Sequence, residues 1–374
     1  MKTFIALWIV VVLWVPVGAA GGAEAWQAEW DKTVKAAKEE GKVIIYAFAG
    51  GPELPIEAGV FQKRFPEIKV VTVSGDPVPR VLAERRAEKY VADVVIGGSS
   101  TTWDLYLVKA LDSLKDAMIL PEVMDESKWW QGRHRWSDAE RKYSFMFLGN
   151  PQRGGIAYNT TLINPKEFQS FWDFVQPKWK GKIEARDIRA SGPGSPNVRI
   201  FYHTAGLGPD FIKRLFGEME ITFFRDRRQA VDWLANGKFA ICFFCSSTDV
   251  GRAKKQGLPV NEFGEMKEGV GLTSSGGNVG LANRAPHPNA AKVFANWLLS
   301  REGQLTVQTS YAKAGNTVNS LRVDIPKEMI PQADRLREGV NYIEGETPER
   351  MSMEPVLKIF NEALAEAEKR KREH

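Results

Sequence analysis

One stretch decides the fold class: Asp93-Val-Val-Ile-Gly-Gly-Ser-Ser-Thr101. Its apolar half is typical of a buried strand, and the glycines and hydroxyl residues after it are typical of a loop leading into a helix. The segments 42–48 and 68–73 are similar apolar runs, and helical patterns at 56–65 and 78–90 separate the three. Because strands and helices alternate at this spacing, the sequence predicts an α/β fold with a parallel sheet.

Small and hydroxyl residues follow each of these three strands where the strand ends. They are Gly50, Ser74, Gly75, Ser99, Ser100 and Thr101. Ligands of open α/β sheets bind at the carboxyl ends of the strands, where helix N-termini offer free N–H groups and partial positive charge. One such loop is explained by turn formation alone, because glycine and serine are common turn residues. Three loops at one edge of a sheet predict a ligand-binding cleft.

A second α/β body is predicted in the middle of the chain. Apolar strands are expected at 155–159 and 239–244, with an amphipathic helix within 223–237 between them. A loop rich in serine, glycine and proline covers 187–197, and the tail at 354–371 has helical periodicity. The chain therefore has enough predicted elements for two α/β units.

Composition supports two folded domains and excludes several classes of site. A chain of 374 residues with 43% hydrophobic residues has the length for two domains and the apolar content for their cores. Its net charge of +5 is spread along the chain, so a nucleic-acid partner is not predicted. The four histidines are scattered, and two cysteines cannot by themselves fill a tetrahedral zinc site. We therefore predict no metal site and no cofactor.

The amino terminus is typical of a secretory signal peptide. Met1 and Lys2 precede an apolar run at 4–15, and small residues follow at 18–25. The apolar run is too short to span about 30 Å of hydrocarbon, so a membrane anchor is disfavoured. Residues 1–25 are predicted to be a signal peptide, with cleavage after Ala19 or Ala25. We expect an exported protein, periplasmic or extracellular.

Short motifs occur in a recognisable order along residues 26–304. They are Glu40-Gly-Lys-Val-Ile-Ile-Tyr46, Phe61-Gln-Lys-Arg-Phe-Pro66, Ala92-Asp-Val-Val95, Ile156-Ala-Tyr-Asn159, Pro177-Lys-Trp-Lys-Gly-Lys-Ile183, Lys255-Gln-Gly-Leu-Pro-Val260, Ala285-Pro-His-Pro-Asn-Ala-Ala-Lys292 and Trp297-Leu-Leu-Ser-Arg-Glu-Gly-Gln304. In this order and spacing they resemble the type II extracellular (periplasmic) solute-binding proteins of ABC importers, in the branch of ferric-ion, thiamine and organophosphonate binders.

The resemblance implies two α/β lobes joined by crossing hinge strands, with a ligand cleft between them. The first lobe would hold residues 26–136 and 281–323, and the second 137–280 and 324–374. The implied function is to capture a small solute and deliver it to a membrane permease and its ATPase. The binding protein would contact the membrane transporter peripherally, act as a monomer and have no nucleic-acid partner.

The resemblance also implies ligand contacts in the second lobe and at the return crossing. They are Tyr158, Arg189, Ser191, Ser195, Ser246, Ser247 and Asn278. Hydroxyls, backbone N–H groups and a guanidinium suit an oxyanion, so an organic anion is the expected solute. Ferric-binding relatives carry two adjacent tyrosines after the strand at 239–244, where this chain has Cys245-Ser246-Ser247. Ferric iron is thereby disfavoured, unless a second anion completes its site.

Two further features have alternative interpretations. Cys242 and Cys245 end a predicted strand, where side chains three positions apart point to opposite faces, so buried structural cysteines are preferred over a redox motif, and whether they are oxidised stays open. The aromatic segment Trp129–Trp136 either covers a ligand or packs under a loop between the lobes.

An enzyme is not predicted. The sequence has no G-x-S-x-G, P-loop, H-E-x-x-H or G-x-G-x-x-G motif. A cysteine nucleophile at Cys242 or Cys245 with His203 or His134 as base stays formally open, but no pattern places these residues together. An exported enzyme on the same two-lobed fold is therefore the alternative to a solute binder.

Overall fold

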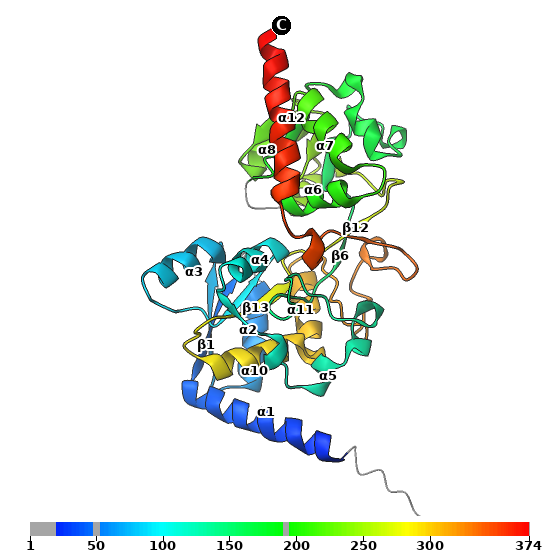
Figure 1. Cartoon of the computed structure of the whole chain (residues 1–374). Helices are drawn as coiled ribbons and strands as arrows, with labels where there is room; N and C mark the ends of the chain where they lie inside the picture. The colour runs from blue at the N-terminus through cyan, green and yellow to red at the C-terminus, as the bar shows by residue number, and fades with distance from the viewer. Residues whose placement is uncertain (1–19, 48–52, 190–193, 374) are drawn as a thin grey trace, which may run out of the picture.

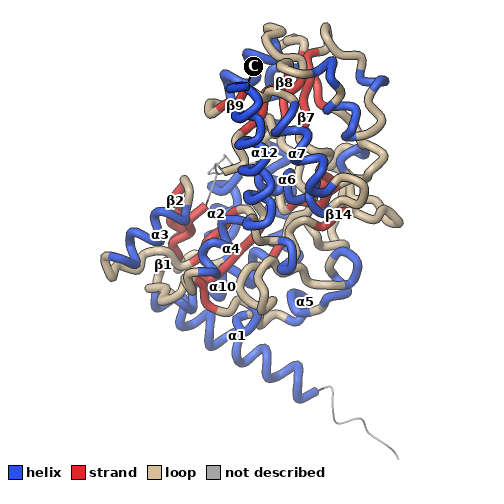
Figure 2. The backbone as a smooth tube through the Cα atoms, turned by 45° about the horizontal axis from the view of Figure 1, so that its top comes forward, coloured by secondary structure: helices blue, strands red, loops and turns tan. Residues whose placement is uncertain are grey.

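The chain folds into two bodies, one above the other in Figure 1. The computed structural model describes residues 20–47, 53–189 and 194–373. Each body has a β-sheet with helices packed against it (Figure 2). The α/β class and the two-lobed architecture predicted from the sequence are thereby confirmed.

The sheet of the first body has the strand order β2-β1-β3-β13-β4, with β5 also paired to β13. Its strands are β1 (Lys42–Ala47), β2 (Lys69–Ser74), β3 (Val94–Gly97), β4 (Leu111–Asp112), β5 (Phe145–Met146) and β13 (Asn278–Ala282). β1 is parallel to β2 and β3, whereas β13 is antiparallel to β3. The three strands predicted to be parallel are therefore neighbours, and their carboxyl ends share one edge.

Helices cover both faces of this sheet because apolar side chains alternate along its strands. They are α1 (Ala20–Glu40), α2 (Glu53–Arg64), α3 (Pro77–Arg86), α4 (Ser99–Leu107), α5 (Pro121–Met124), α10 (Pro288–Leu299) and α11 (Arg301–Lys313). Val43 and Ile45 of β1 join the core that also contains residues of α1, α2 and α10. Tyr46 points to the other face, where it packs with Val81 of α3 and Leu105 of α4.

The sheet of the second body has the order β11-β7-β10-β8-β9. Its strands are β7 (Ile156–Asn159), β8 (Ile183–Arg186), β9 (Thr222–Phe224), β10 (Ile241–Phe243) and β11 (Val260–Glu262). One face packs on α6 (Gly194–His203), α7 (Gly208–Glu218) and α12 (Glu354–Glu373), and the other on α8 (Arg227–Ala235) and α9 (Ser247–Lys255). The carboxyl-terminal helix α12 lies beside α7 (Figure 1), with Phe360 against Phe216 at a ring-centroid distance of 4.8 Å.

A small third sheet joins the two bodies. It has the order β14-β12-β6, with β6 (Asn150–Gln152) antiparallel and β14 (Ile343–Glu344) parallel to β12 (Gly271–Thr273). Each of these strands lies in the chain between an element of the first body and an element of the second. The remaining ordered segments are 3-10 turns at Lys115–Ala117, Glu126–Lys128, Trp130–Gly132, Pro165–Glu167, Phe171–Val175, Pro177–Trp179, Gln332–Asp334 and Pro348–Arg350.

The lobe bounds given above stay a prediction. Strand pairing groups β5 and β13 with the first sheet, although residues 137–280 were assigned to the second lobe. The difference arises because β5 is a short strand followed at once by a crossing. Its two residues carry no period that could be read from the sequence.

No helix in the described part of the chain is both long and apolar enough to cross a bilayer. Residues 1–19 of the predicted signal peptide lie outside the described residues, and residues 20–25 are the first turns of α1. The signal peptide therefore stays a prediction.

Gly303 allows two helices to meet closely, which leads to a testable prediction. A Cβ at this position would lie 2.0 Å from the carbonyl oxygen of Trp297 and 2.7 Å from that of Leu298. These are backbone atoms, so Gly303→Ala should destabilise the first body by about 2–3 kcal/mol. Calorimetric unfolding checks this against Gly251→Ala, whose Cβ would have nothing within 4 Å. Equal melting temperatures for the two variants would contradict it.

Candidate functional site

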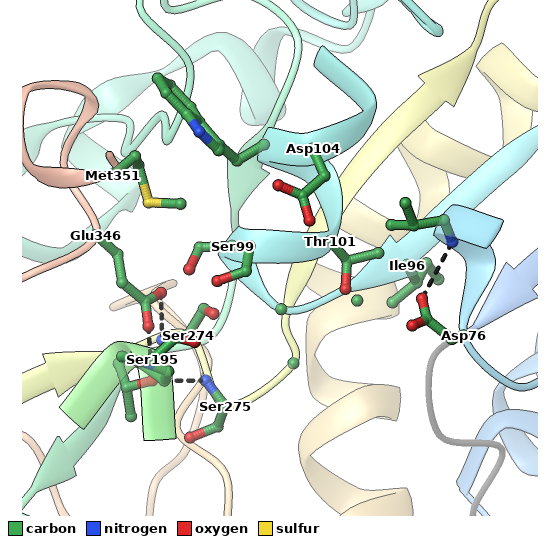
Figure 3. Close-up of a pocket in the computed structure, with 18 of the residues that line it drawn as sticks. Asp76, Ile96, Ser99, Thr101, Asp104, Ser195, Ser274, Ser275, Glu346 and Met351 are labelled. Carbon is green, nitrogen blue, oxygen red and sulfur yellow. Dashed lines mark hydrogen bonds between the residues drawn. The ribbon is translucent and has the colours of Figure 1, made fainter. Parts of the chain in front are cut away.

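A cavity of about 1110 Å³ lies where the two bodies face each other. Polar residues that line it include Glu57, Asp76, Ser99, Ser100, Thr101, Asp104, Gln152, Arg189, Ser195, Asn197, Arg199, Thr273, Ser274, Ser275, Glu346 and Glu354. Most of them come from α4 of the first body, from α6 of the second, and from the end of β12 and the segments that follow β12 and β14. Figure 3 shows these three sources around one space. The volume is sufficient for a small organic molecule.

The first turn of α4 forms one wall of the cavity. Gly97 ends β3, and a Cβ there would lie 2.9 Å from the side chain of Thr101, so only glycine lets the helix start this close to the strand. The following residue, Gly98, is the N-cap and provides no side-chain hydrogen bond to the helix. The first N–H groups of α4 therefore lack a side-chain cap and can bind a ligand instead.

Arg199 of α6 reaches across the cavity to this helix. Its side chain is fully buried; Nη2 donates to Ser99 Oγ at 3.3 Å and Nη1 donates to Ser100 Oγ at 3.4 Å. Nη1 also donates to the Met351 carbonyl oxygen at 3.3 Å, whereas Nε has no hydrogen-bond partner in the described part of the chain. The buried guanidinium thus has an unused N–H donor at Nε, and it faces the N-terminus of α4. An anion between the two accepts hydrogen bonds from both.

Carboxylates balance part of this positive charge. Glu346 is buried, and it accepts hydrogen bonds from Thr273 Oγ1 at 2.8 Å and from the Ser274 backbone N–H at 3.0 Å. Burial lowers the pKa of Arg199, and the negative charges of Glu346 and Asp104 oppose that shift. Arginine nevertheless stays protonated in proteins. Partial desolvation, together with the negative charge of Asp76, raises the pKa of Asp104, while Arg199 lowers it.

Five of the predicted site residues line the cavity: Ser99, Ser100, Thr101, Arg189 and Ser195. Ser99 and Thr101 are buried in the first turn of α4, and Ser195 lies in the first turn of α6 (Figure 3). Arg189 is half-exposed and paired with Asp187, to which its Nη2 donates at 2.6 Å. Its charge is thus already neutralised at the edge of the cavity.

Six other predicted residues do not line the cavity, and their contacts explain why. Ser74 and Gly75 are exposed, and the next residue, Asp76, lines the cavity in their place. Ser246 caps α9 by accepting a hydrogen bond from the Asp249 backbone N–H, and Ser247 donates to Glu262 Oε1 at 2.6 Å.

The other two of these six are buried in the bodies. Tyr158 packs in the aromatic core of the second body against Phe263. Asn278 Nδ2 donates to Ser137 Oγ at 2.9 Å and to Ser144 Oγ at 3.1 Å inside the first body. The last two predicted residues, Gly50 and Ser191, lie outside the described residues.

Sequence reasoning missed the residues that only the fold brings to the cavity. They are Asp76, Asp104, Asn197, Arg199, Thr273, Ser274 and Glu346. Arg199 follows Ser195 by four positions, so both lie on one face of α6, but the sequence had predicted a loop at residues 187–197 and no helix there. Thr273, Ser274 and Glu346 had no local signal, because the two crossing segments that carry them are far apart in the sequence.

The sequence left the oxidation state of Cys242 and Cys245 open, and in the structure the two buried residues form a disulfide. The strand β10 ends at Phe243, and Phe244 has a positive φ of 62°. This left-handed residue turns the chain, and the Cα atoms of the two cysteines are 5.9 Å apart. The argument from strand alternation failed because Cys245 is no longer in the strand.

The aromatic segment 129–136 packs inside the first body and does not cover the cavity. Trp129 and Trp136 are buried against Phe145, and neither they nor Trp130 line the cavity. Arg135 is also buried and donates to the Trp130 carbonyl oxygen at 2.6 Å and to Glu344 at 3.3 Å. The segment therefore supports the crossing strand β14 rather than a ligand.

Comparisons with known proteins bear on the fold. No protein-family model matches the chain. No curated protein matches its sequence. Among solved structures, a substrate-binding protein of an ABC transporter from Agrobacterium tumefaciens is 17% identical, with a TM-score of 0.64 over 86% of this chain and 94% of that one.

Two further structures have ligands in their descriptions. The periplasmic binding protein AfuA from Actinobacillus pleuropneumoniae, with fructose-6-phosphate bound, is 20% identical, with a TM-score of 0.62 over 87% of this chain and 98% of that one. The Trichodesmium protein FutA (IdiA), in complex with iron and citrate, is 18% identical, with a TM-score of 0.62 over 88% of this chain and 99% of that one. The chain thus has the two-lobed fold of the type II periplasmic solute-binding proteins that its sequence resembles.

Proposed function

We propose that this protein is the extracytoplasmic solute-binding component of an ABC importer. Its two lobes close over a small organic anion, and the loaded protein delivers the solute to a membrane permease driven by an ATPase. The observation that carries the proposal is Arg199, a buried cation aimed across the cavity between the two bodies at the open N-terminus of α4. Export from the cytoplasm and action as a monomer belong to the same proposal.

Three kinds of hydrogen-bond donor at and beside Arg199 favour an anionic group on the ligand. The Nε–H of Arg199 is buried without a partner in the described part of the chain, and the hydroxyls of Ser99 and Ser100 accept only long bonds from the guanidinium. The first N–H groups of α4 add a partial positive charge, and the first turn of α6 with Ser195 lines the same cavity. Carboxylate and phosphate oxygens satisfy such donors at short distances.

The rest of the cavity selects against a second strong negative charge. Asp76, Asp104 and Glu346 line it together with the anion-binding groups. Like charges at this range repel, whereas hydroxyl or ammonium groups donate hydrogen bonds to carboxylates. We therefore propose a solute with one anionic end and donor groups over the remainder.

Native mass spectrometry of the full chain recovered from an exported fraction tests the proposal. We expect one solute of low mass per chain, released on unfolding. Adding the identified solute back should raise the melting temperature with its concentration, as binding to the folded state requires. Recovery of product in place of the added solute would support the enzyme alternative, and recovery of ferric iron with an anion would support the iron-binding alternative.

A further inference from the structure

Glu184 has a buried carboxylate that the fold leaves without a hydrogen bond. Its side chain is 0% exposed, and neither carboxylate oxygen has a hydrogen-bond partner among the residues that the structure describes. The positive charge of Lys238 acts on it only from a distance that gives no hydrogen bond. Buried carboxylates are normally hydrogen-bonded, paired with a cation or bound to a metal. As far as the described residues show, the buried Glu184 carboxylate is therefore available to bind a ligand.

The Cys242–Cys245 disulfide lies directly beside this carboxylate. Glu184 in β8 is in register with Cys242 in β10, so both side chains leave the same face of the sheet. The turn at Phe244 brings Cys245 to the same place. The two sulfur atoms and one carboxylate oxygen of Glu184 all lie within 4.8 Å of one another. Three groups that bind metals are thus assembled in one buried position.

The donor set specifies the class of cation. Two thiolates and one carboxylate suit a thiophilic divalent cation such as Zn²⁺, whereas Mg²⁺ and Ca²⁺ prefer shells of oxygen ligands. With bond lengths of about 2.3 Å to sulfur and 2.0–2.2 Å to oxygen, a tetrahedral ion holds its donors roughly 3.5–4 Å apart. Donors within 4.8 Å reach this geometry by side-chain rotation once the sulfur–sulfur bond is broken.

The surroundings keep the site separate from the solute cavity. Val231 and Leu234 of α8 and Val250 of α9 share a hydrophobic cluster with the two cysteines, on the face of the sheet opposite α6. No residue of this cluster lines the solute cavity, as far as the structure describes it. Three protein ligands leave the fourth position of a tetrahedral ion for water or a small exogenous ligand.

We propose that Cys242, Cys245 and Glu184 form a redox-gated site for a thiophilic divalent cation, which binds only when the disulfide is reduced. An external dithiol breaks the sulfur–sulfur bond, both cysteines become thiols, and the dithiol is oxidised to its own disulfide with transfer of two electrons. The cation then displaces the protons of the ligands, which are released to solvent. An external disulfide accepts two electrons from the two cysteines and is reduced to its thiols, which re-forms the Cys242–Cys245 bond and releases the cation.

Cobalt binding to the full chain tests the site. The chain is reduced with dithiothreitol in urea, refolded without oxygen and freed of the reductant, and its thiols are counted. The refolded chain should bind one Co²⁺ with a thiolate-to-cobalt charge-transfer absorption, and one equivalent of Zn²⁺ should remove that absorption. The oxidised chain should give no such absorption. Equal spectra for the reduced and oxidised chains would overturn the proposal.

Variants separate the ligands from background binding. Cys242→Ser/Cys245→Ser should lose the absorption entirely, and it retains all four histidines as a measure of adventitious binding. Glu184→Gln retains both thiolates and the shape of the side chain, yet it should bind Zn²⁺ at least tenfold more weakly. Glu262→Gln, on the edge strand β11 of the same sheet, should bind as the unaltered chain does. Unchanged Zn²⁺ affinity in Glu184→Gln, or full uptake in the serine variant, would contradict the assignment.

Discussion

Replacing Arg199 with methionine is expected to weaken binding of the anionic solute about 100-fold while the chain remains folded. The side chain is fully buried, and truncating one partner of a buried charged contact costs about 2–5 kcal/mol. Methionine has a similar length without the charge, so the variant leaves no unpaired cation inside the protein. Titration calorimetry with the solute identified by mass spectrometry measures the change in Kd.

Three further variants show whether the effect belongs to the site. Arg199→Lys keeps the charge but loses the planar set of donors, so its affinity should fall between those of the unaltered chain and Arg199→Met. Arg252→Met removes an exposed arginine of α9 and should leave the Kd unchanged. The pair Ser246→Ala/Ser247→Ala should also leave it unchanged, because these residues lie outside the cavity. Equal affinity in Arg199→Met and Arg252→Met would remove Arg199 from the site.

Replacing Glu184 with glutamine is expected to stabilise the protein at alkaline pH. Burial raises the pKa of Glu184 from 4.5 to about 8, with Lys238 opposing the shift. The folded state therefore holds a proton that the unfolded chain releases above pH 4.5. Stability is greatest below that pH and is lost as the pH rises through 8, where the buried carboxylate becomes charged. Glutamine is neutral throughout and removes this loss.

The size of the effect follows from the shift in pKa. Each pKa unit corresponds to about 1.4 kcal/mol, so the gain in unfolding free energy from Glu184→Gln should grow by on the order of 4 kcal/mol between pH 5 and pH 9. For a folded body of about 150–250 residues this is roughly 8–16 °C in melting temperature. Scanning calorimetry of the disulfide-bonded chains checks it, with the exposed Glu366→Gln as the control. A gap in melting temperature that does not vary with pH would contradict the prediction.

The accuracy of the sequence predictions depended on how local each feature is. The strands at 42–48, 68–73 and 93–96 were identifiable because a buried parallel strand is a short apolar run between turn residues. Ser99 and Ser100 were identifiable because parallel strands bring their carboxyl ends to one edge whatever the rest of the chain does. These predictions need only the neighbouring residues and the geometry of a sheet.

The strand position of Cys245 and the core position of Tyr158 were not predictable, for the opposite reason. Cys245 was misjudged because a single left-handed residue, Phe244, ended the strand one position earlier than the apolar run implied. Tyr158 lies in a strand whose two faces are both buried, so its sequence does not say which face points to the core and which to a ligand. Glu344 lies in the crossing strand β14 and Glu346 follows it, and a strand of two residues is too short to carry a period.

By itself the sequence determined that this chain forms two α/β bodies with a cleft at the ends of parallel strands, because the alternation of apolar runs and turn residues is a local property. Only the tertiary structure decided which charged side chains contact which other residues. It brings Arg199 of α6 to Ser99 and Ser100 of α4 across 99 or 100 positions, and it places Glu184 beside Cys242 through strand pairing. The physical reason is that contacts between distant segments depend on strand order and helix packing, which no local pattern encodes.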